Sequence, residues 1–149
     1  RDTDRSRGLG DVYKRQEVSG SAKGSVNLHY QMPKGEIANS REDMTFLTQF
    51  EDGSNMKLQC FGPEGMSMKK EPGWCSTAYR KRYKRMNVSF NVKKDNENAV
   101  RYITVIYPVK KSADAPKFDA KFKNKTFDEN GLEIEVKVNG KKQSLKYKL

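Results

Sequence analysis

Apolar and polar side chains alternate with a period of two along several short segments of the chain. In residues 25–32 the even-numbered positions are apolar and the odd-numbered positions are polar, which is typical of a strand with one buried face. Residues 44–50 and 100–107 are denser in apolar side chains, so we expect these two strands to be central and covered on both faces. The same alternation predicts further strands at 56–60, 86–92, 132–138 and 145–149.

Turn-forming dipeptides separate these segments. Asp52-Gly53 follows the strand expected at 44–50, and Asn139-Gly140 lies between the last two strands. Both dipeptides accept the positive φ angles of tight hairpin turns, so residues 131–149 are predicted to form a hairpin. No window of helical length carries a 3.6-residue apolar stripe. The sequence therefore predicts an all-β antiparallel sandwich or barrel.

Two segments of the chain lack the alternation of the predicted strands, and they set the domain boundaries that we expect. Residues 1–16 begin with Arg and show neither apolar periodicity nor the order of a secretory signal, and their run SRGLGDVYKRQ resembles translated adapter DNA. We therefore predict that the chain is a fragment, that residues 1–16 are non-native or disordered, and that the β domain covers 17–149. Pro108 and Pro116 predict a break between two sub-blocks near 108–117.

A strongly basic composition points to an anionic partner. The 149 residues carry a formal charge of +11, and the surplus survives the exclusion of residues 1–16. Such a surplus favours nucleic acid, anionic lipid, or sulfated and carboxylated glycans. No apolar stretch approaches the roughly 20 residues of a membrane-spanning helix, so no membrane span is expected.

Three residues are candidates for metal, redox or acid–base chemistry. Cys60 and Cys75 lack the CxxC units or accompanying histidines of zinc sites, so no metal is expected. They are interpreted as reduced, half-buried thiols, and a disulfide between them stays open for an exported protein. His29, the only histidine, lies on the polar side of its predicted strand and is interpreted as structural, with a ligand contact or a proton carrier as the alternative. A single histidine excludes every site that needs two.

The strongest local signal is a basic run with aromatic neighbours, expected in a loop. Five cations in this run repel one another, and an anionic ligand lying across them would stabilise the loop. The aromatic residues could stack on a sugar ring, while the alternative is a solvated basic loop. A nucleic acid is disfavoured because no RNP-type motif, finger spacing or recognition helix is present. The predicted polyanion-binding residues are Arg80, Lys81, Arg82, Lys84, Arg85, Trp74, Tyr79 and Tyr83.

Two motifs in this part of the chain match a known family. Residues 71–79 read EPGWCSTAY, residues 102–108 read YITVIYP, and an upstream strand at 26–30 reads VNLHY. They resemble the "GW-x-S-x-x-Y" element, the strand ending in "TV-[IL]-x-P", and the preceding strand of the C-terminal β-sandwich in the heparinase II/III family of polysaccharide lyases. The resemblance spans about residues 17–110.

The resemblance implies a fold, a function and a missing part. The fold is an antiparallel β-sandwich cut from a larger protein with an N-terminal α/α-toroid, and the parent is a periplasmic or secreted lyase that cleaves uronic-acid glycans such as heparan sulfate by β-elimination. The family's catalytic asparagine and tyrosine belong to the toroid, and its histidines lie earlier in the sandwich and do not match His29. We therefore expect no catalytic residue and no cofactor here, and no activity of this chain alone. The alternative is a stand-alone, non-enzymatic module that binds carbohydrate or another polyanion.

Overall fold

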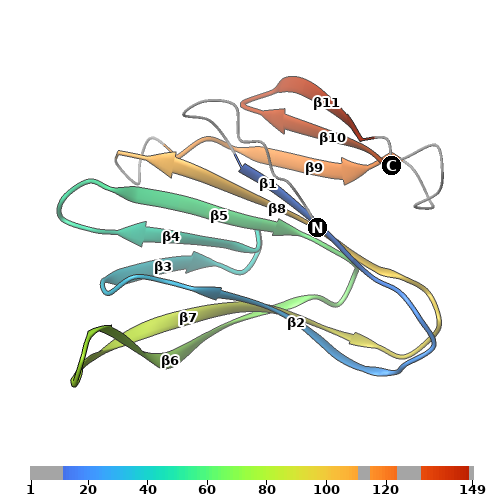
Figure 1. The fold of residues 1–149 in the computed structure, drawn as a ribbon. Helices are drawn as coiled ribbons and strands as arrows, with labels where there is room; N and C mark the ends of the chain where they lie inside the picture. Colours follow the sequence, from blue (N-terminus) through green and yellow to red (C-terminus); the bar gives the residue numbers. More distant parts are fainter. Residues whose placement is uncertain (1–11, 111–114, 124–131, 148–149) are drawn as a thin grey trace. The chain divides into compact units, whose positions relative to one another are not determined.

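The computed structural model describes residues 12–110, 115–123 and 132–147, and within these residues it contains strands and no helix (Figure 1). The chain divides into two compact units, residues 1–113 and 114–149.

The first unit consists of two antiparallel sheets. The five-stranded sheet has the order β1-β8-β5-β4-β3, and the three-stranded sheet has the order β2-β7-β6 (Figure 1). The strands are β1 (Val12–Val18), β2 (Gly24–Gln31), β3 (Glu36–Ser40), β4 (Thr45–Gln49), β5 (Asn55–Phe61), β6 (Ser67–Ala78), β7 (Lys81–Lys94) and β8 (Val100–Val109).

The hydrophobic core of this unit draws on both sheets. Phe90 of β7 packs against Phe46 of β4 and Tyr30 of β2, with ring centroids 5.4 and 6.1 Å away. The hydroxyl of Tyr30 donates a hydrogen bond of 2.8 Å to Oγ1 of the fully buried Thr104 on β8, which joins the two sheets through a polar contact. The buried core residues are Leu28, Met32, Ile37, Phe46, Leu58, Cys60, Val88, Phe90, Val92, Val100 and Tyr102.

The predicted fold class is confirmed, because the unit is an antiparallel β-sandwich. The segments 44–50 and 100–107, predicted to be central, correspond to β4 and β8, which are both interior strands of the five-stranded sheet. Three strands of this unit, β1, β3 and β6, have no counterpart among the predicted segments. β3 is short and polar, and β6 contains Gly73 and Pro72, which are typical of edge or irregular strands.

The N-terminal segment differs in part from the expectation. Residues 12–16, which the sequence pattern places outside the fold, form the first part of β1 and pair with β8 from Ile106 to Tyr102. An exposed strand edge offers unpaired N–H and C=O groups, so a segment can join a sheet without a strong apolar pattern of its own. The non-native origin of residues 1–16 stays a prediction, and residues 1–11 lie outside the described residues.

The second unit contains one antiparallel sheet of order β11-β10-β9, formed by β9 (Phe118–Phe122), β10 (Leu132–Val138) and β11 (Lys141–Tyr147). Asn139 and Gly140 have φ angles of 48° and 82° and connect β10 to β11 in a two-residue turn. The predicted C-terminal hairpin is therefore confirmed over residues 132–147. In this hairpin the side chain of Glu135 is only 5% exposed, and its carboxylate lies 2.6 Å from Nζ of Lys142.

Candidate functional site

The predicted basic loop is a β-hairpin, which corrects the expectation from the sequence. β6 and β7 run antiparallel and meet at a turn formed by Tyr79 and Arg80, where Arg80 has a φ angle of 60°. The strands continue to this turn because backbone pairing stabilises them even though their side chains are polar and charged. We call residues 74–85 the hairpin tip.

One side of the hairpin tip carries an indole ring close to two cations. Trp74 lies directly across from Lys84, and the even-numbered residues of β7 share its side of the sheet. The guanidinium carbon of Arg82 lies 4.7 Å from the Trp74 ring centroid, and Nζ of Lys84 lies 5.8 Å from it. Trp74 is 52% exposed. These three residues, which we call the Trp74 face, form a cation pair held in place by an aromatic ring.

The other side of the tip carries the odd-numbered residues of β7. Tyr83 lies across from Cys75, and a side-chain hydrogen bond with Cys75 raises the pKa of the Tyr83 hydroxyl above its usual value. The guanidinium of Arg85 donates a hydrogen bond to Oε1 of Gln31 on the neighbouring β2. Lys81 is on this side as well, so the five predicted cations divide between two faces and the turn.

The turn completes the tip. Tyr79 is 85% exposed, and the guanidinium carbon of Arg80 lies 5.1 Å from its ring centroid. That the aromatic residues stack on a sugar ring stays a prediction, and the structure adds that Trp74 and Tyr79 each have a guanidinium group near the ring. Trp74 and Tyr79 position the guanidinium groups of Arg82 and Arg80. The Tyr83 hydroxyl is hydrogen-bonded to the Cys75 thiol.

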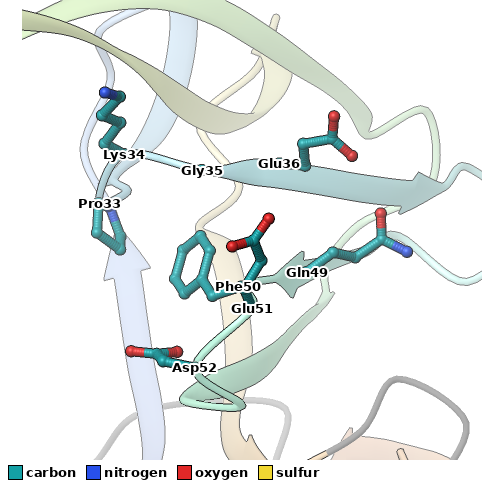
Figure 2. A pocket seen from close by; sticks show the side chains of 8 residues that line it. All are labelled: Pro33, Lys34, Gly35, Glu36, Gln49, Phe50, Glu51 and Asp52. Carbon is teal, nitrogen blue, oxygen red and sulfur yellow. The ribbon is translucent and has the colours of Figure 1, made fainter.

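A pocket of about 710 Å³ lies elsewhere in the unit, where the loop after β2 meets the end of β4 (Figure 2). The ring of Phe50 fills the space beside Gly35, since a Cβ at Gly35 would lie 2.2 Å from Cε1 of Phe50. Glu36, Glu51 and Asp52 line the pocket with a single lysine. Three carboxylates repel a polyanion, so this pocket is not suited to the ligand expected from the overall charge.

Of the other candidate residues, Cys60 and His29 lie outside the hairpin tip, and Cys75 lies within it. Cys60 is buried in the core, where burial raises the pKa of its thiol to about 12, and it is not bonded to Cys75. Cys75 lies in β6 rather than in the expected loop. His29 is exposed on the polar side of β2. The described residues contain no cluster of three or more His, Cys, Asp or Glu that could hold a metal ion. In the described part of the chain we find no helix with the length and apolar character needed to cross a membrane.

The sequence reasoning did not identify Gln31 as the partner of Arg85. Gln31 and Arg85 are 54 positions apart, and only the register of β2 on β7 brings their side chains together. The polar alternation of residues 25–31 shows that Gln31 faces away from the core, but it contains no signal for the register.

Comparison with known proteins gives strong matches over most of the chain. No family model matches the sequence. A heparin-sulfate lyase of Bacteroides stercoris is 87% identical over 133 residues, which represent 89% of this chain and 20% of the relative. A heparin-sulfate lyase of Bacteroides thetaiotaomicron is 28% identical over 137 residues, again 89% of this chain and 20% of the relative. The chain thus spans about a fifth of the length of the curated relatives it matches.

Solved structures agree in fold. The heparinase III BT4657 gene product matches with a TM-score of 0.89 and 95% identity, over 94% of this chain and 22% of that protein. A crystal structure of heparinase III matches with a TM-score of 0.83 and 27% identity, over 92% of this chain and 21% of that protein. With this identity and this fold, the chain belongs to the heparinase II/III family of polysaccharide lyases, as a β-sandwich segment of it.

Proposed function

We propose that this chain is the accessory β-sandwich of a heparin- or heparan-sulfate lyase that acts by β-elimination in the periplasm or outside the cell. Its matched relatives are heparin-sulfate lyases about five times as long, which supports a role within a larger enzyme. In this role the sandwich holds the acidic polysaccharide, and the toroid domain of the parent protein performs the cleavage.

The division of labour follows from the chemistry. β-Elimination on a uronic acid requires neutralisation of the carboxylate, a base that removes the C5 proton, and an acid that protonates the leaving oxygen. At the hairpin tip the described residues are cations, aromatic rings, two hydroxyls, one thiol and one alanine, with no carboxylate or imidazole among residues 74–85. The tip can therefore bind and orient an anionic chain, and the proton transfers belong to groups elsewhere in the parent enzyme.

The observation that carries the proposal is the Trp74 face. A guanidinium held over an indole ring loses less side-chain freedom when it binds an anion, and its planar fork matches two oxygens of a sulfate or carboxylate. Lys84 adds a second cation on the same side of the sheet, beside the same ring. An isolated solvated lysine lacks this pre-organisation, so the Trp74 face should bind a sulfated glycan more tightly than other basic residues do.

The test compares two charge-matched double variants of the 149-residue chain. Arg82→Ala/Lys84→Ala removes one arginine and one lysine from the Trp74 face. Lys23→Ala/Arg41→Ala removes the same charges from exposed positions outside the tip. Two charge-assisted hydrogen bonds contribute about 1.5–3 kcal/mol each before non-additivity, so the first variant should bind heparan sulfate at least about tenfold more weakly.

Calorimetric titration with heparan sulfate at low and physiological salt measures this difference. Binding of the unmodified chain should fall steeply as salt rises, because bound cations release counterions from the glycan. Equal losses in the two double variants would show that the chain is a diffuse polycation, and the assignment of the Trp74 face would then be wrong. The unmodified chain should also release no unsaturated uronate from heparan sulfate, as followed by ultraviolet absorbance.

A further inference from the structure

The three-stranded sheet has an outer face made of hydrogen-bonding side chains. Where β2 pairs with β7, the residues that point away from the core include four amides, one hydroxyl and one imidazole, namely Asn27, His29, Gln31, Asn87, Ser89 and Asn91, and the Ser25–Lys93 pair continues the same side. We call these six residues the amide face. They differ from the residues of the Trp74 face, which lies on the other side of the same sheet.

The strand register arranges the amide face in rows. Asn27 pairs with Asn91, His29 with Ser89, and Gln31 with Asn87. Paired side chains lie about 4.5–5.5 Å apart across the strands, and successive rows are about 7 Å apart along them. Ser89 is only 2% exposed, so the donors and acceptors that the array presents to solvent come from the other five residues.

Two polar atoms at one end of this array are shielded and unbonded. Among the described residues, only three side-chain N or O atoms are shielded from solvent without a hydrogen-bond partner, and two of them are Nε of Arg85 and Oδ1 of Asn87. Gly73 on β6 leaves room for this amide, since a Cβ there would lie 2.5 Å from Nδ2 of Asn87. Shielded polar atoms without a hydrogen-bond partner are costly to the fold, and a ligand would contact the exposed groups of the face instead.

The remaining polar groups of the face are partly used within the protein. Nδ2 of Asn91 donates to Oγ of Ser89 over 3.2 Å, and Oε1 of Gln31 accepts from Arg85. In the described part of the chain, the exposed side chains of Asn27 and His29 form no hydrogen bond with another residue. The face thus keeps donors and acceptors available to a ligand.

The composition of the face selects the class of ligand. A protein partner needs an apolar or aromatic anchor, and none of the six residues is one. A nucleic acid needs several unpaired cations, but the neighbouring lysines are paired, Lys69 with Glu71 at 2.7 Å and Lys93 with Asp95 at 3.1 Å. Amides, hydroxyls and imidazoles both donate and accept hydrogen bonds, which matches the hydroxyl groups of a sugar.

We propose that the amide face is a second glycan-binding surface, which recognises the hydroxyl groups of a uronic-acid polysaccharide through neutral hydrogen bonds. The inference rests on the proposed function for the class of polymer, but it depends on different residues and a different kind of interaction. Binding at the amide face is therefore insensitive to salt and does not require sulfate, whereas binding at the Trp74 face requires both low salt and anionic groups.

His29 provides a direct probe, because it is the only histidine in the chain. Its imidazole resonances are recorded in the 149-residue chain at constant pH while desulfated heparan sulfate is added in about 1 M salt, where the screening length is about 3 Å. We expect the resonances to shift and saturate. Asn27→Ala should weaken this binding about two- to tenfold, the range of one neutral hydrogen bond. Asn98→Ala, in the exposed loop after β7, is the matched control and should leave the affinity unchanged.

Other outcomes separate the two proposals. A silent His29, or equal effects of Asn27→Ala and Asn98→Ala, overturns the amide face. If the amide face is overturned in this way while Arg82→Ala/Lys84→Ala weakens low-salt binding, the proposal for the Trp74 face is supported without the amide face. A saturating His29 shift in a chain whose low-salt affinity is unaffected by Arg82→Ala/Lys84→Ala supports the amide face and rejects the Trp74 face. A sedimentation dimer that dissociates in Asn27→Ala would make the face a self-association surface and overturn the inference.

Discussion

The hydrogen bond between Tyr30 and Thr104 should stabilise the sandwich by holding its two sheets together. Tyr30 donates to Oγ1 of Thr104 over 2.8 Å, and Thr104 donates in turn to Sγ of Cys60 over 3.6 Å. Burial raises the pKa of the Tyr30 hydroxyl, which agrees with its location at the edge of the core. The perturbations are Tyr30→Phe, Thr104→Val and the double variant.

The structure indicates that the two single variants differ in cost. After Tyr30→Phe, the Thr104 hydroxyl still donates to Cys60, so the loss should be about 0.5–1.5 kcal/mol, the net value of one hydrogen bond. After Thr104→Val, the tyrosine hydroxyl is desolvated without its acceptor, and the loss should be about 1–3 kcal/mol. In the double variant neither partner is left unpaired, so its loss should be smaller than the sum by about 1 kcal/mol.

Urea denaturation of the four chains measures these free energies of unfolding. The comparison is valid where the dependence on urea concentration is the same for all four, because a changed slope would report an altered unfolded or folded state. Strict additivity of the two single losses would refute the reasoning, because it would show that the side chains do not stabilise each other. A larger loss for Tyr30→Phe than for Thr104→Val would refute the assigned direction of the hydrogen-bond chain.

Three further predictions concern other parts of the chain. Cys60, whose thiol pKa is raised to about 12 by burial, should resist alkylation in the folded protein at pH 8, while the second, half-buried cysteine reacts; mass spectrometry of the labelled peptides distinguishes them. Gly140→Ala should destabilise the second unit by about 1 kcal/mol, because a φ of 82° is unfavourable for a residue with a Cβ, and thermal unfolding measures the loss. The hydrogen bond from Lys142 lowers the pKa of the Glu135 carboxyl below its usual 4.5. The ionised carboxylate therefore stabilises the fold fully above pH 4.5. This contribution is lost as the pH falls through the lower pKa of the folded state. Lys142→Ala should flatten this acid dependence in unfolding experiments, and Lys141→Ala should not.

Periodicity predicted most strands that bury one face, although the five-residue β9, which also buries alternate residues, was missed. The core strands β2, β5 and β7 place apolar residues at alternate positions and β8 is densely apolar, and both patterns are readable without a structure. β6 reads SMKKEPGWCSTA and has no such pattern, because it is an edge strand held largely by its backbone pairing with β7. Backbone hydrogen bonds between strands impose no pattern on the side chains, so the sequence does not reveal them.

The candidate site was predictable in composition and not in arrangement. The basic run from Arg80 to Arg85 and the nearby Trp74 are visible in the sequence. Their division between two faces depends on the strand geometry of β7, and the contact of Arg85 with Gln31 depends on the register of β2. Both features come from long-range pairing, and local sequence patterns do not encode the partner of a strand.

The length difference between β2 and β7 separates stability from recognition. β2 pairs with β7 from Asn87 to Lys94, while residues 81–85 of β7 pair with β6 alone, beyond the sandwich core (Figure 1). Substitutions in this two-stranded ribbon remove no residue of the core cluster. Evolution or engineering can therefore rewrite the charges of the ribbon, and with them the choice of anionic polymer, while the folded scaffold keeps its free energy of unfolding. The ribbon is the part of this sandwich in which new specificities can arise at least risk to folding.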